Sequence, residues 1–194
     1  MVIRVKIILM ESFETATFAG GCFWCTEAIF KRLKGVKSVS PGYSGGDKEN
    51  PTYEEVTTGI TGHAESIQIE FNPNEISYEV LLDIFWHTHD PTTLNQQGND
   101  IGTQYRSAIF YASKKQQEEA EKSKQRAEKE QVFKDPIITQ ILPFKNFYTA
   151  ESYHKDYYER NKDYPYCTFI INPKIQKLLS KYSKIIKPEY LKEV

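Results

Sequence analysis

The chain has 194 residues and a formal net charge of −1, because 25 Lys and Arg offset 26 Asp and Glu. This length is enough for one domain with its own core, and the balanced charge excludes nucleic acid as the main partner on electrostatic grounds. The longest apolar run near the start, residues 6–10, is too short for the core of a signal peptide, and no other segment approaches a membrane span. We therefore expect no membrane partner.

The three cysteines are Cys22, Cys25 and Cys167. An odd and low count does not make the disulfide framework of a small secreted domain, so we expect reduced thiols and a cytoplasmic location. Aromatic residues make up 13% of the chain, including 13 Tyr, which favours a polar pocket with aromatic walls.

Periodicity and turn residues predict alternating strands and helices in the first half of the chain. Gly35 ends the first helix, whereas Ser77 is the N-cap and Pro91 lies beyond the end of the second. The predicted elements are a strand at 14–20, a helix at 22–35, a strand at 36–46 that dissolves into a Gly-rich loop, a loop at 50–63, a strand at 64–73 and a helix at 77–91.

The second half continues with a polar loop and a strand, followed by a polar helix that can bury little beyond Ala120 and Ala127. We interpret that helix as an outer one. The predicted elements are the loop at 93–104, the strand at 105–112, the outer helix at 113–131, a strand at 136–144, a short helix at 149–161, a strand-like stretch at 168–172 and a final basic helix.

The core elements follow the order β-α-β-β-α-β, which is that of the ferredoxin-like plait. We expect an α+β fold in which helices cover one face of a largely antiparallel sheet, as a two-layer α/β sandwich with additional helices and an extended C-terminal tail. A single domain would have its core at about 14–172, an N-terminal extension at 1–13 and a C-terminal helical tail at 173–194.

Cys22 follows Gly20 and Gly21 and opens the first predicted helix. Free backbone N–H groups and the positive end of the helix dipole stabilise a thiolate at such a position, and the glycines leave the sulfur open. The alternative is a buried structural cysteine, and the position favours the reactive interpretation.

Cys25 shares a helical stripe with Ile29 and Leu33, so it is either a small core residue or a redox partner of Cys22. A CxxC pair where a strand meets a helix is also typical of thioredoxin-like disulfide exchangers. The bulky Phe23 and Trp24 between the two cysteines look more like a wall for a small apolar group.

Glu65 shares one face of its strand with Ile67, Ile69 and Phe71. A carboxyl group on an apolar face loses hydration, so its pKa rises, and a protonated Glu near neutral pH suits a general acid. The alternative is that the strand end projects into water and Glu65 is solvated. His63 points the same way if the strand extends.

A zinc site is a further alternative, built from the four histidines with Cys22 and Cys25. We do not expect it, because the chain has no second CxxC and His87 and His89 do not share a helical face. A thiol hydrolase is disfavoured because no His-Asn pair is placed as a base. Loop residues Asp100, Tyr53 and Tyr105 are weak indicators on their own.

Six stretches together resemble the signature blocks of the A-type peptide methionine sulfoxide reductases. The resemblance runs from about Phe18 to Cys167, in the family's order, and it implies an α+β domain on a ferredoxin-like plait. The stretches read GGCFWCTEAIFKRLKGV, PGYSGG, NPTYEEV, TGHAESIQIEFNP, HDPTTLNQQGNDIGTQYRSAIFY and AESYHKDY.

The resemblance implies a reaction and a role for each candidate residue. A cysteine attacks the sulfur of methionine sulfoxide once the sulfoxide oxygen is protonated or hydrogen-bonded, and it ends as a sulfenic acid. The implied roles are Cys22 as nucleophile, Glu65 as acid, Tyr53 and Tyr105 as hydrogen-bond donors to the oxygen, Asp100 as organiser of its loop and ligand of polar parts of the substrate, Phe23 and Trp24 as enclosure of the S-methyl group, and His154 as a further substrate-binding residue.

The family also implies how the enzyme is recycled. A second thiol resolves the sulfenic acid, and thioredoxin reduces the resulting disulfide. Cys167, in the Tyr- and Pro-rich stretch 164–167, resembles a C-terminal resolving cysteine and is favoured over Cys25. The implied substrate is the S epimer of methionine sulfoxide, free or in oxidised proteins, and we expect a monomer without a cofactor or metal that serves protein repair.

Overall fold

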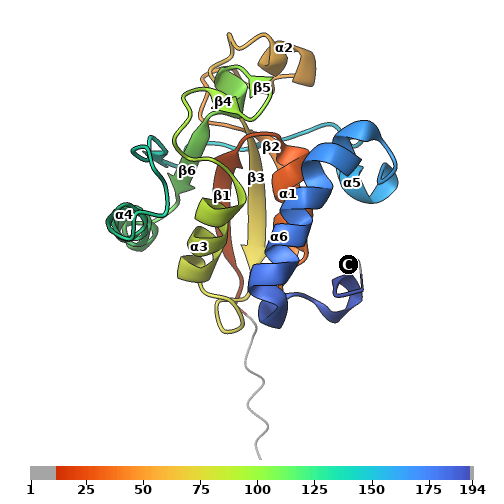
Figure 1. Cartoon of the computed structure of the whole chain (residues 1–194). Helices are drawn as coiled ribbons and strands as arrows, with labels where there is room; N and C mark the ends of the chain where they lie inside the picture. Colours follow the sequence, from red (N-terminus) through yellow and green to blue (C-terminus); the bar gives the residue numbers. More distant parts are fainter. Residues whose placement is uncertain (1–11, 193–194) are drawn as a thin grey trace, which may run out of the picture.

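A computed structural model describes residues 12–192 of the chain. Most of the N-terminal extension predicted at 1–13 lies outside this range. A six-stranded mixed sheet forms the centre, in the order β7-β6-β1-β3-β2-β8 (Figure 1), and its neighbours are antiparallel except for the parallel pair β6 and β7. The strands are β1 (Glu14–Gly20), β2 (Val36–Ser44), β3 (Ala64–Phe71), β6 (Ser107–Tyr111), β7 (Gln140–Pro143) and β8 (Tyr148–Thr149).

Helices pack against this sheet and against one another. Helix α1 contacts β2 and β3, α3 contacts β1 and α4, and α6 lies over α1 and α3 (Figure 1). The helices are α1 (Phe23–Lys31), α2 (Tyr53–Thr57), α3 (Tyr78–Thr88), α4 (Lys114–Lys129), α5 (Tyr157–Arg160) and α6 (Asn172–Tyr182), with single turns of 3-10 helix at Thr103–Tyr105, Ser183–Ile185 and Pro188–Tyr190. The mixed sheet with its helices makes an α+β fold.

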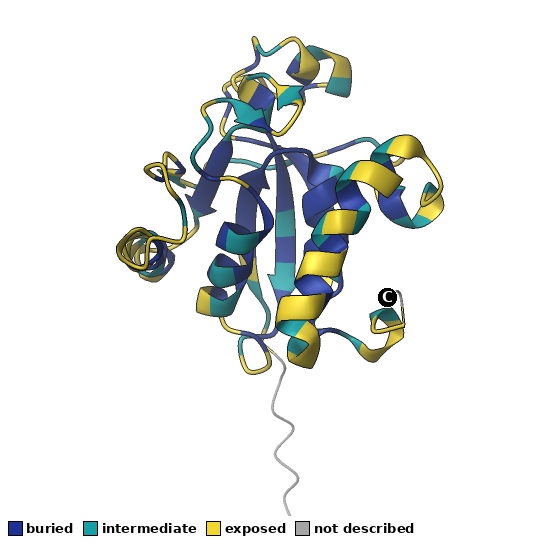
Figure 2. Cartoon of the chain, in the orientation of Figure 1, coloured by how far each residue is buried: buried dark blue, intermediate teal, exposed yellow. Residues whose placement is uncertain are grey.

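Strand β3 shows why helices cover one face of the sheet. Its residues Ile67, Ile69 and Phe71 are fully buried and belong to the main hydrophobic cluster, together with the apolar stripe of α1. Side chains alternate along a strand, so Glu65 points to the same face. In Figure 2 the central strands are buried along most of their length, whereas the outer sides of α4 and α6 are exposed.

The prediction of a strand-like stretch at 168–172 is wrong. Residues Cys167–Ile171 form a π-helical turn that continues directly into α6, whose buried residues include Ile175 and Leu178. A short apolar run fits a buried helix as well as a strand, and helical spacing of the residues that follow decides between them.

Four other predictions needed correction. The loop predicted at 50–63 contains α2, which begins with a capping box between Thr52 and Glu55. The loop predicted at 93–104 contains a small hairpin, β4 (Gln96–Gln97) and β5 (Asp100–Ile101). The predicted strand at 136–144 and helix at 149–161 are shorter, as β7 and α5. Among residues 12–192, no helix combines the length and apolar character that a bilayer crossing requires.

Candidate active site

A small cavity of about 50 Å³ lies where the first turn of α1 meets β3 and three loops. Seven of its eight lining residues are site residues predicted from the sequence, and the eighth, Tyr166, is not. The lining residues are Cys22, Phe23, Trp24, Tyr53, Glu65, Asp100, Tyr105 and Tyr166.

The turn before α1 sets the position of Cys22, which is the N-cap residue of the helix. Gly21 has a φ of +82°, and a Cβ there would lie 2.5 Å from Cγ of Gln97. The side chain of Gln97 is fixed by two hydrogen bonds to the backbone of Asp90, each 3.0 Å long. Only glycine fits at position 21, both for its backbone conformation and for the close approach of Gln97.

Glu65 is buried, with 2% of its surface exposed, and its Oε2 accepts a hydrogen bond from the backbone N–H of Phe23 at 3.0 Å. Burial raises the pKa of its carboxyl group from 4.5 to about 8, although the Phe23 hydrogen bond opposes the shift. The raised pKa predicted from the apolar face of β3 is therefore confirmed. At neutral pH this carboxyl group carries a proton that it can donate.

Burial also raises the pKa of the Cys22 thiol, with a further contribution from its hydrogen bond to Cys25. The helix terminus gives the Cys22 side chain no direct hydrogen bond: Cys22 is an N-cap residue without a side-chain cap bond, and the N–H of Phe23 is bonded to Glu65. The same hydrogen bond from Cys22 lowers the pKa of the Cys25 thiol. In the substrate-free site, burial and the contact with Cys25 therefore favour the neutral thiol of Cys22 over its thiolate.

Two aromatic side chains form one wall of the cavity. Trp24 stacks on Tyr157 with ring centroids 3.6 Å apart and donates a hydrogen bond from Nε1 to Nδ1 of His154 at 3.1 Å. Phe23 stacks on Tyr53, with centroids 6.5 Å apart. This rigid apolar wall beside Cys22 is suited to a small apolar group such as a methyl.

Tyr53, the first residue of α2, and Tyr105, in the 3-10 turn Thr103–Tyr105, both line the cavity. Within residues 12–192, neither hydroxyl group has a hydrogen-bond partner, so both are available to a ligand. Burial raises the pKa of Tyr53 to about 12 and raises that of Tyr105 as well. Both side chains are consequently hydrogen-bond donors at neutral pH. Glu151 fixes the start of α2 by accepting a bond from the Tyr53 N–H at 2.9 Å.

Tyr166 also lines the cavity, with its ring edge-on to that of Trp24 and the two ring centroids 5.9 Å apart. Its hydroxyl group donates a hydrogen bond to Oδ2 of Asp100 at 2.7 Å and lies 3.9 Å from Sγ of Cys25. This residue was not predicted from the sequence, although it stands next to Cys167 in the stretch 164–167. An aromatic residue beside a candidate cysteine was the available signal.

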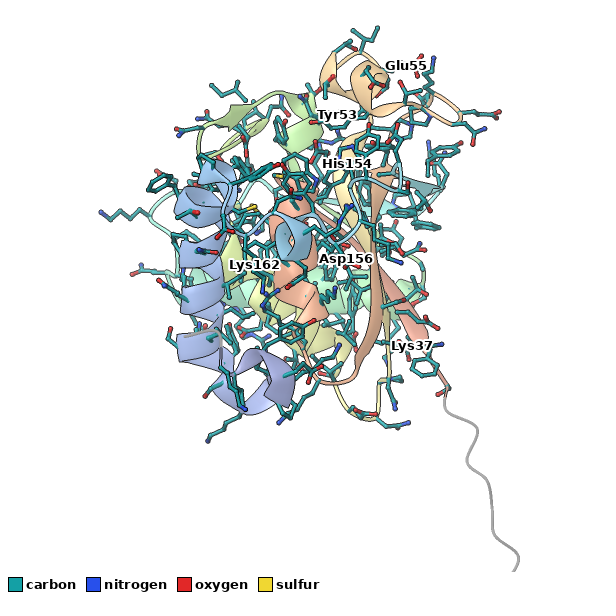
Figure 3. The ribbon with its side chains drawn as sticks, turned by 90° about the vertical axis from the view of Figure 1, so that its right-hand side faces the viewer. Lys37, Tyr53, Glu55, His154, Asp156 and Lys162 are labelled. Atoms are coloured by element: carbon teal, nitrogen blue, oxygen red, sulfur yellow. The ribbon has the colours of Figure 1, made fainter. Side chains whose placement is uncertain are left out.

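Three predicted site residues do not line the cavity. Cys25 and Cys167 are both buried, at 1% and 0% exposure, on α1 and on the π-helical turn. His154 lies behind the wall: its ring is 4.4 Å from that of Tyr53 and 4.9 Å from that of Phe23. Figure 3 shows Tyr53 and His154 close together on the α5 side of the molecule. His154 therefore supports the wall rather than touching the cavity.

The histidines weighed for a zinc site lie apart, each with its own partner. His63 bonds to the Lys48 carbonyl at 2.7 Å, His89 to the Ser107 hydroxyl at 2.8 Å and His87 to the Asp83 carbonyl at 2.7 Å. In the part of the chain that the structure describes, no group of three or more His, Cys, Asp or Glu side chains is arranged to hold a metal ion.

Comparisons with known proteins agree with this geometry. A family model described as peptide methionine sulfoxide reductase matches residues 14–186. A peptide methionine sulfoxide reductase MsrA of Sulfolobus acidocaldarius is 54% identical over 169 residues, covering 87% of this chain and 95% of that protein. The crystal structure of Mxr1 from Saccharomyces cerevisiae in reduced form is similar, with a TM-score of 0.75 and 36% identity over 80% of this chain and 89% of that one.

A second yeast structure, that of Mxr1 in complex with Trx2, is similar with a TM-score of 0.54 and 26% identity, over 78% of this chain and 91% of that one.

Proposed function

The chain belongs to the peptide methionine sulfoxide reductase family, and we propose that the Cys22 cavity is the place where it reduces its substrate. The protein is a thiol-dependent methionine sulfoxide reductase that thioredoxin recycles. One observation carries the assignment of the site: a buried, protonated Glu65, two available tyrosine hydroxyls and the Cys22 thiol line one cavity of about 50 Å³. That volume suits the sulfoxide end of a side chain.

In the first step, the sulfoxide oxygen accepts hydrogen bonds from Tyr53 and Tyr105 and a proton from Glu65. Protonation makes the substrate sulfur electrophilic, and Sγ of Cys22 attacks it as the thiol proton passes to the Glu65 carboxylate. The hydroxyl group then moves from the substrate sulfur to Sγ as the bond between the two sulfurs breaks, which leaves a sulfenic acid on Cys22 and a thioether as product. The cysteine is thus oxidised by two electrons and the substrate sulfur is reduced by two. Phe23 and Trp24 hold the S-methyl group.

The second step needs another thiol, and the geometry supports Cys25. Its sulfur already contacts Cys22 through a hydrogen bond, and its lowered pKa favours the thiolate that attacks a sulfenic acid. We therefore propose that Cys25 forms the first disulfide with release of water, although the sequence favours Cys167. Thioredoxin then reduces the disulfide by thiol–disulfide exchange.

The substrate is proposed to be the S epimer at sulfur, free or in oxidised proteins, as the family resemblance implies. Asp100 is proposed to bind the polar backbone of the substrate. Tyr166 donates its hydrogen bond to Oδ2 of Asp100, so Oδ1 can accept a hydrogen bond from the substrate. His154 is proposed to act through Trp24, whose indole it anchors.

We further propose that the central strands form the ferredoxin-like plait. The order β6-β1-β3-β2, with α1 and α3 as the crossover helices, supports this assignment. The expected core at about 14–172 is proposed to form one catalytic domain with α6, because α6 packs on α1 and α3. We also propose that the protein is a monomer and is located in the cytoplasm. The low cysteine count supports a reducing compartment.

One experiment tests the proposed function directly. The purified protein is incubated with dithiothreitol and an equal mixture of the two epimers of N-acetyl-methionine sulfoxide methyl amide, and each epimer is followed by chiral chromatography. We expect the S epimer to disappear and the R epimer to persist. Reduction of the R epimer alone would refute the proposed specificity, and reduction of neither would refute the proposed site chemistry.

A further inference from the structure

Two larger cavities continue from the catalytic cavity along the surface. The first measures about 420 Å³ and shares Asp100 and Tyr166 with the catalytic cavity. The second measures about 430 Å³ and shares Gln97, Pro173 and Lys174 with the first. Because each cavity shares lining residues with the next, the three lie side by side in a row that starts at Cys22, and we call this row of cavities the trough.

One wall of the first cavity is apolar and helical. It consists of Tyr166, Phe169, Ile170 and Pro173, whose spacing of i, i+3, i+4 and i+7 places them on one face of the π-helical turn and α6. Phe169 is 75% exposed, which is unusual for an aromatic side chain on an ordered helix. An apolar helical face that borders a cavity and ends at a catalytic centre is typical of a binding surface.

The opposite wall is the polar loop of residues 97–100, which joins β4 to β5. Figure 3 shows this hairpin above the N-terminal end of α6. Asp100 stands where the first cavity meets the catalytic one, and only one of its carboxylate oxygens is occupied, by Tyr166. The other oxygen can accept a backbone N–H group from a chain that leaves the catalytic cavity.

We propose that this trough binds the polypeptide on either side of an oxidised methionine, with an apolar neighbouring side chain seated against Phe169 and Ile170. The inference rests on the proposed function and extends it to a substrate class: methionine sulfoxide in unfolded or exposed segments with apolar neighbours. The catalytic cavity of about 50 Å³ holds the sulfoxide end alone, so the polypeptide on either side of it lies outside, and the first cavity borders the catalytic one at Asp100 and Tyr166. The first cavity offers apolar surface there, and burial of a neighbouring side chain adds affinity.

The test compares substrates of different length. The S epimer of N-acetyl-methionine sulfoxide methyl amide reaches only the catalytic cavity. Pentapeptides with central methionine sulfoxide carry Leu or Ser on one side or the other and reach the trough. With dithiothreitol as reductant, we expect a Leu neighbour on the favoured side to raise kcat/KM roughly fivefold to tenfold over Ser, mainly through KM.

The variant Phe169→Ser should remove this Leu preference and leave kcat/KM for the blocked single residue unchanged. The matched control is Ile60→Ser, because Ile60 is 86% exposed and lies outside the trough. It should keep the Leu preference. Thermal melts verify that both variants are folded.

Three results would overturn the inference. Equal kcat/KM for Leu and Ser peptides would show that the trough does not bind the side chains next to the oxidised methionine. An equal loss on peptide and blocked residue in Phe169→Ser would indicate damage to the catalytic cavity. A loss confined to turnover with thioredoxin would identify the trough as the thioredoxin surface instead. Failure of the proposed function itself is distinct, since the wild-type protein would then not reduce the blocked residue.

Discussion

The backbone N–H of Phe23 donates a hydrogen bond to Oε2 of Glu65 at 3.0 Å, and Phe23 is the residue directly after Cys22. One peptide unit thus joins the proposed nucleophile on α1 to the proposed acid on β3, 42 residues further along the chain. The bond leaves Oε1 to carry the transferable proton. Any shift of the turn before α1 therefore moves both groups together.

Cys22→Ser should abolish sulfoxide reduction with either dithiothreitol or thioredoxin. A serine hydroxyl group is a far weaker nucleophile toward sulfur than a thiol, because its pKa is much higher. Loss of the S epimer over time gives the rate, and circular dichroism verifies the fold. Turnover close to that of the wild type would remove Cys22 from the mechanism.

Glu65→Gln should lower kcat by about 10² to 10⁴, the usual contribution of a general acid, with a smaller change in substrate binding. Gln can still accept the Phe23 hydrogen bond, so the turn is preserved. In the wild type, kcat/KM should fall as pH rises through about 8, where the Glu65 proton is lost. A variant with a normal rate would transfer the acid role to Tyr53, Tyr105 or water.

The same substitution should stabilise the folded protein at alkaline pH. The folded-state pKa of Glu65 is raised from 4.5 to about 8, so the folded state holds the proton more tightly and wild-type stability falls as pH rises between these values. Gln does not titrate, so the Tm difference between variant and wild type should grow in favour of the variant from about pH 5 to about pH 8. A constant difference across that range would contradict the raised pKa.

Cys25→Ser should stop thioredoxin-driven turnover after one methionine per enzyme, whereas dithiothreitol should restore much of it by reaching the sulfenic acid directly. The matched variant, Cys167→Ser, should keep turnover with thioredoxin. Mass spectrometry of the oxidised wild type should find a peptide that links Cys22 to Cys25. A link from Cys22 to Cys167, with Cys167→Ser stalled, would establish the arrangement favoured by the sequence.

Gly21→Ala should lower both stability and activity, and more than Gly62→Ala. Both glycines have positive φ, +82° and +74°, so backbone strain is similar in the two variants. A Cβ at Gly21 meets Gln97 at 2.5 Å, whereas a Cβ at Gly62 meets only ordinary contacts at 3.4 Å. The extra loss, measured by denaturant unfolding and kcat, reports the fit of the turn that carries Cys22. Equal losses of stability and kcat in the two variants would show that Gln97 moves away from the added Cβ at no cost.

Local patterns were enough to predict half of the residues that line the cavity. Alternation along β3 put Glu65 on the buried face, and the glycine pair before a helical stripe singled out Cys22. Both inferences depend only on residues that are close in the sequence, and such residues form a pattern that is visible without a structure. The roles of Tyr53, Asp100 and Tyr105 came only from the family resemblance, because loop residues carry no such pattern.

What could not be predicted depends on contacts between distant segments. Tyr166 reaches Asp100 across 66 positions, from its place directly before the π-helical turn. The raised pKa of the Cys22 thiol, which comes chiefly from burial, was not anticipated for the same reason. A helix terminus favours a thiolate in isolation, but here its first N–H group is bonded to a carboxyl group from another strand.

The raised pKa of the Cys22 thiol has a consequence for chemical selectivity. Peroxides oxidise thiolates rather than thiols, so a thiol that burial keeps protonated should react with them slowly. A sulfoxide differs from a peroxide because its oxygen gains reactivity from a proton, and Glu65 lines the same cavity with a raised pKa that lets it supply one. This combination favours reaction of the nucleophile with the damaged side chain over reaction with the oxidants that produce the damage.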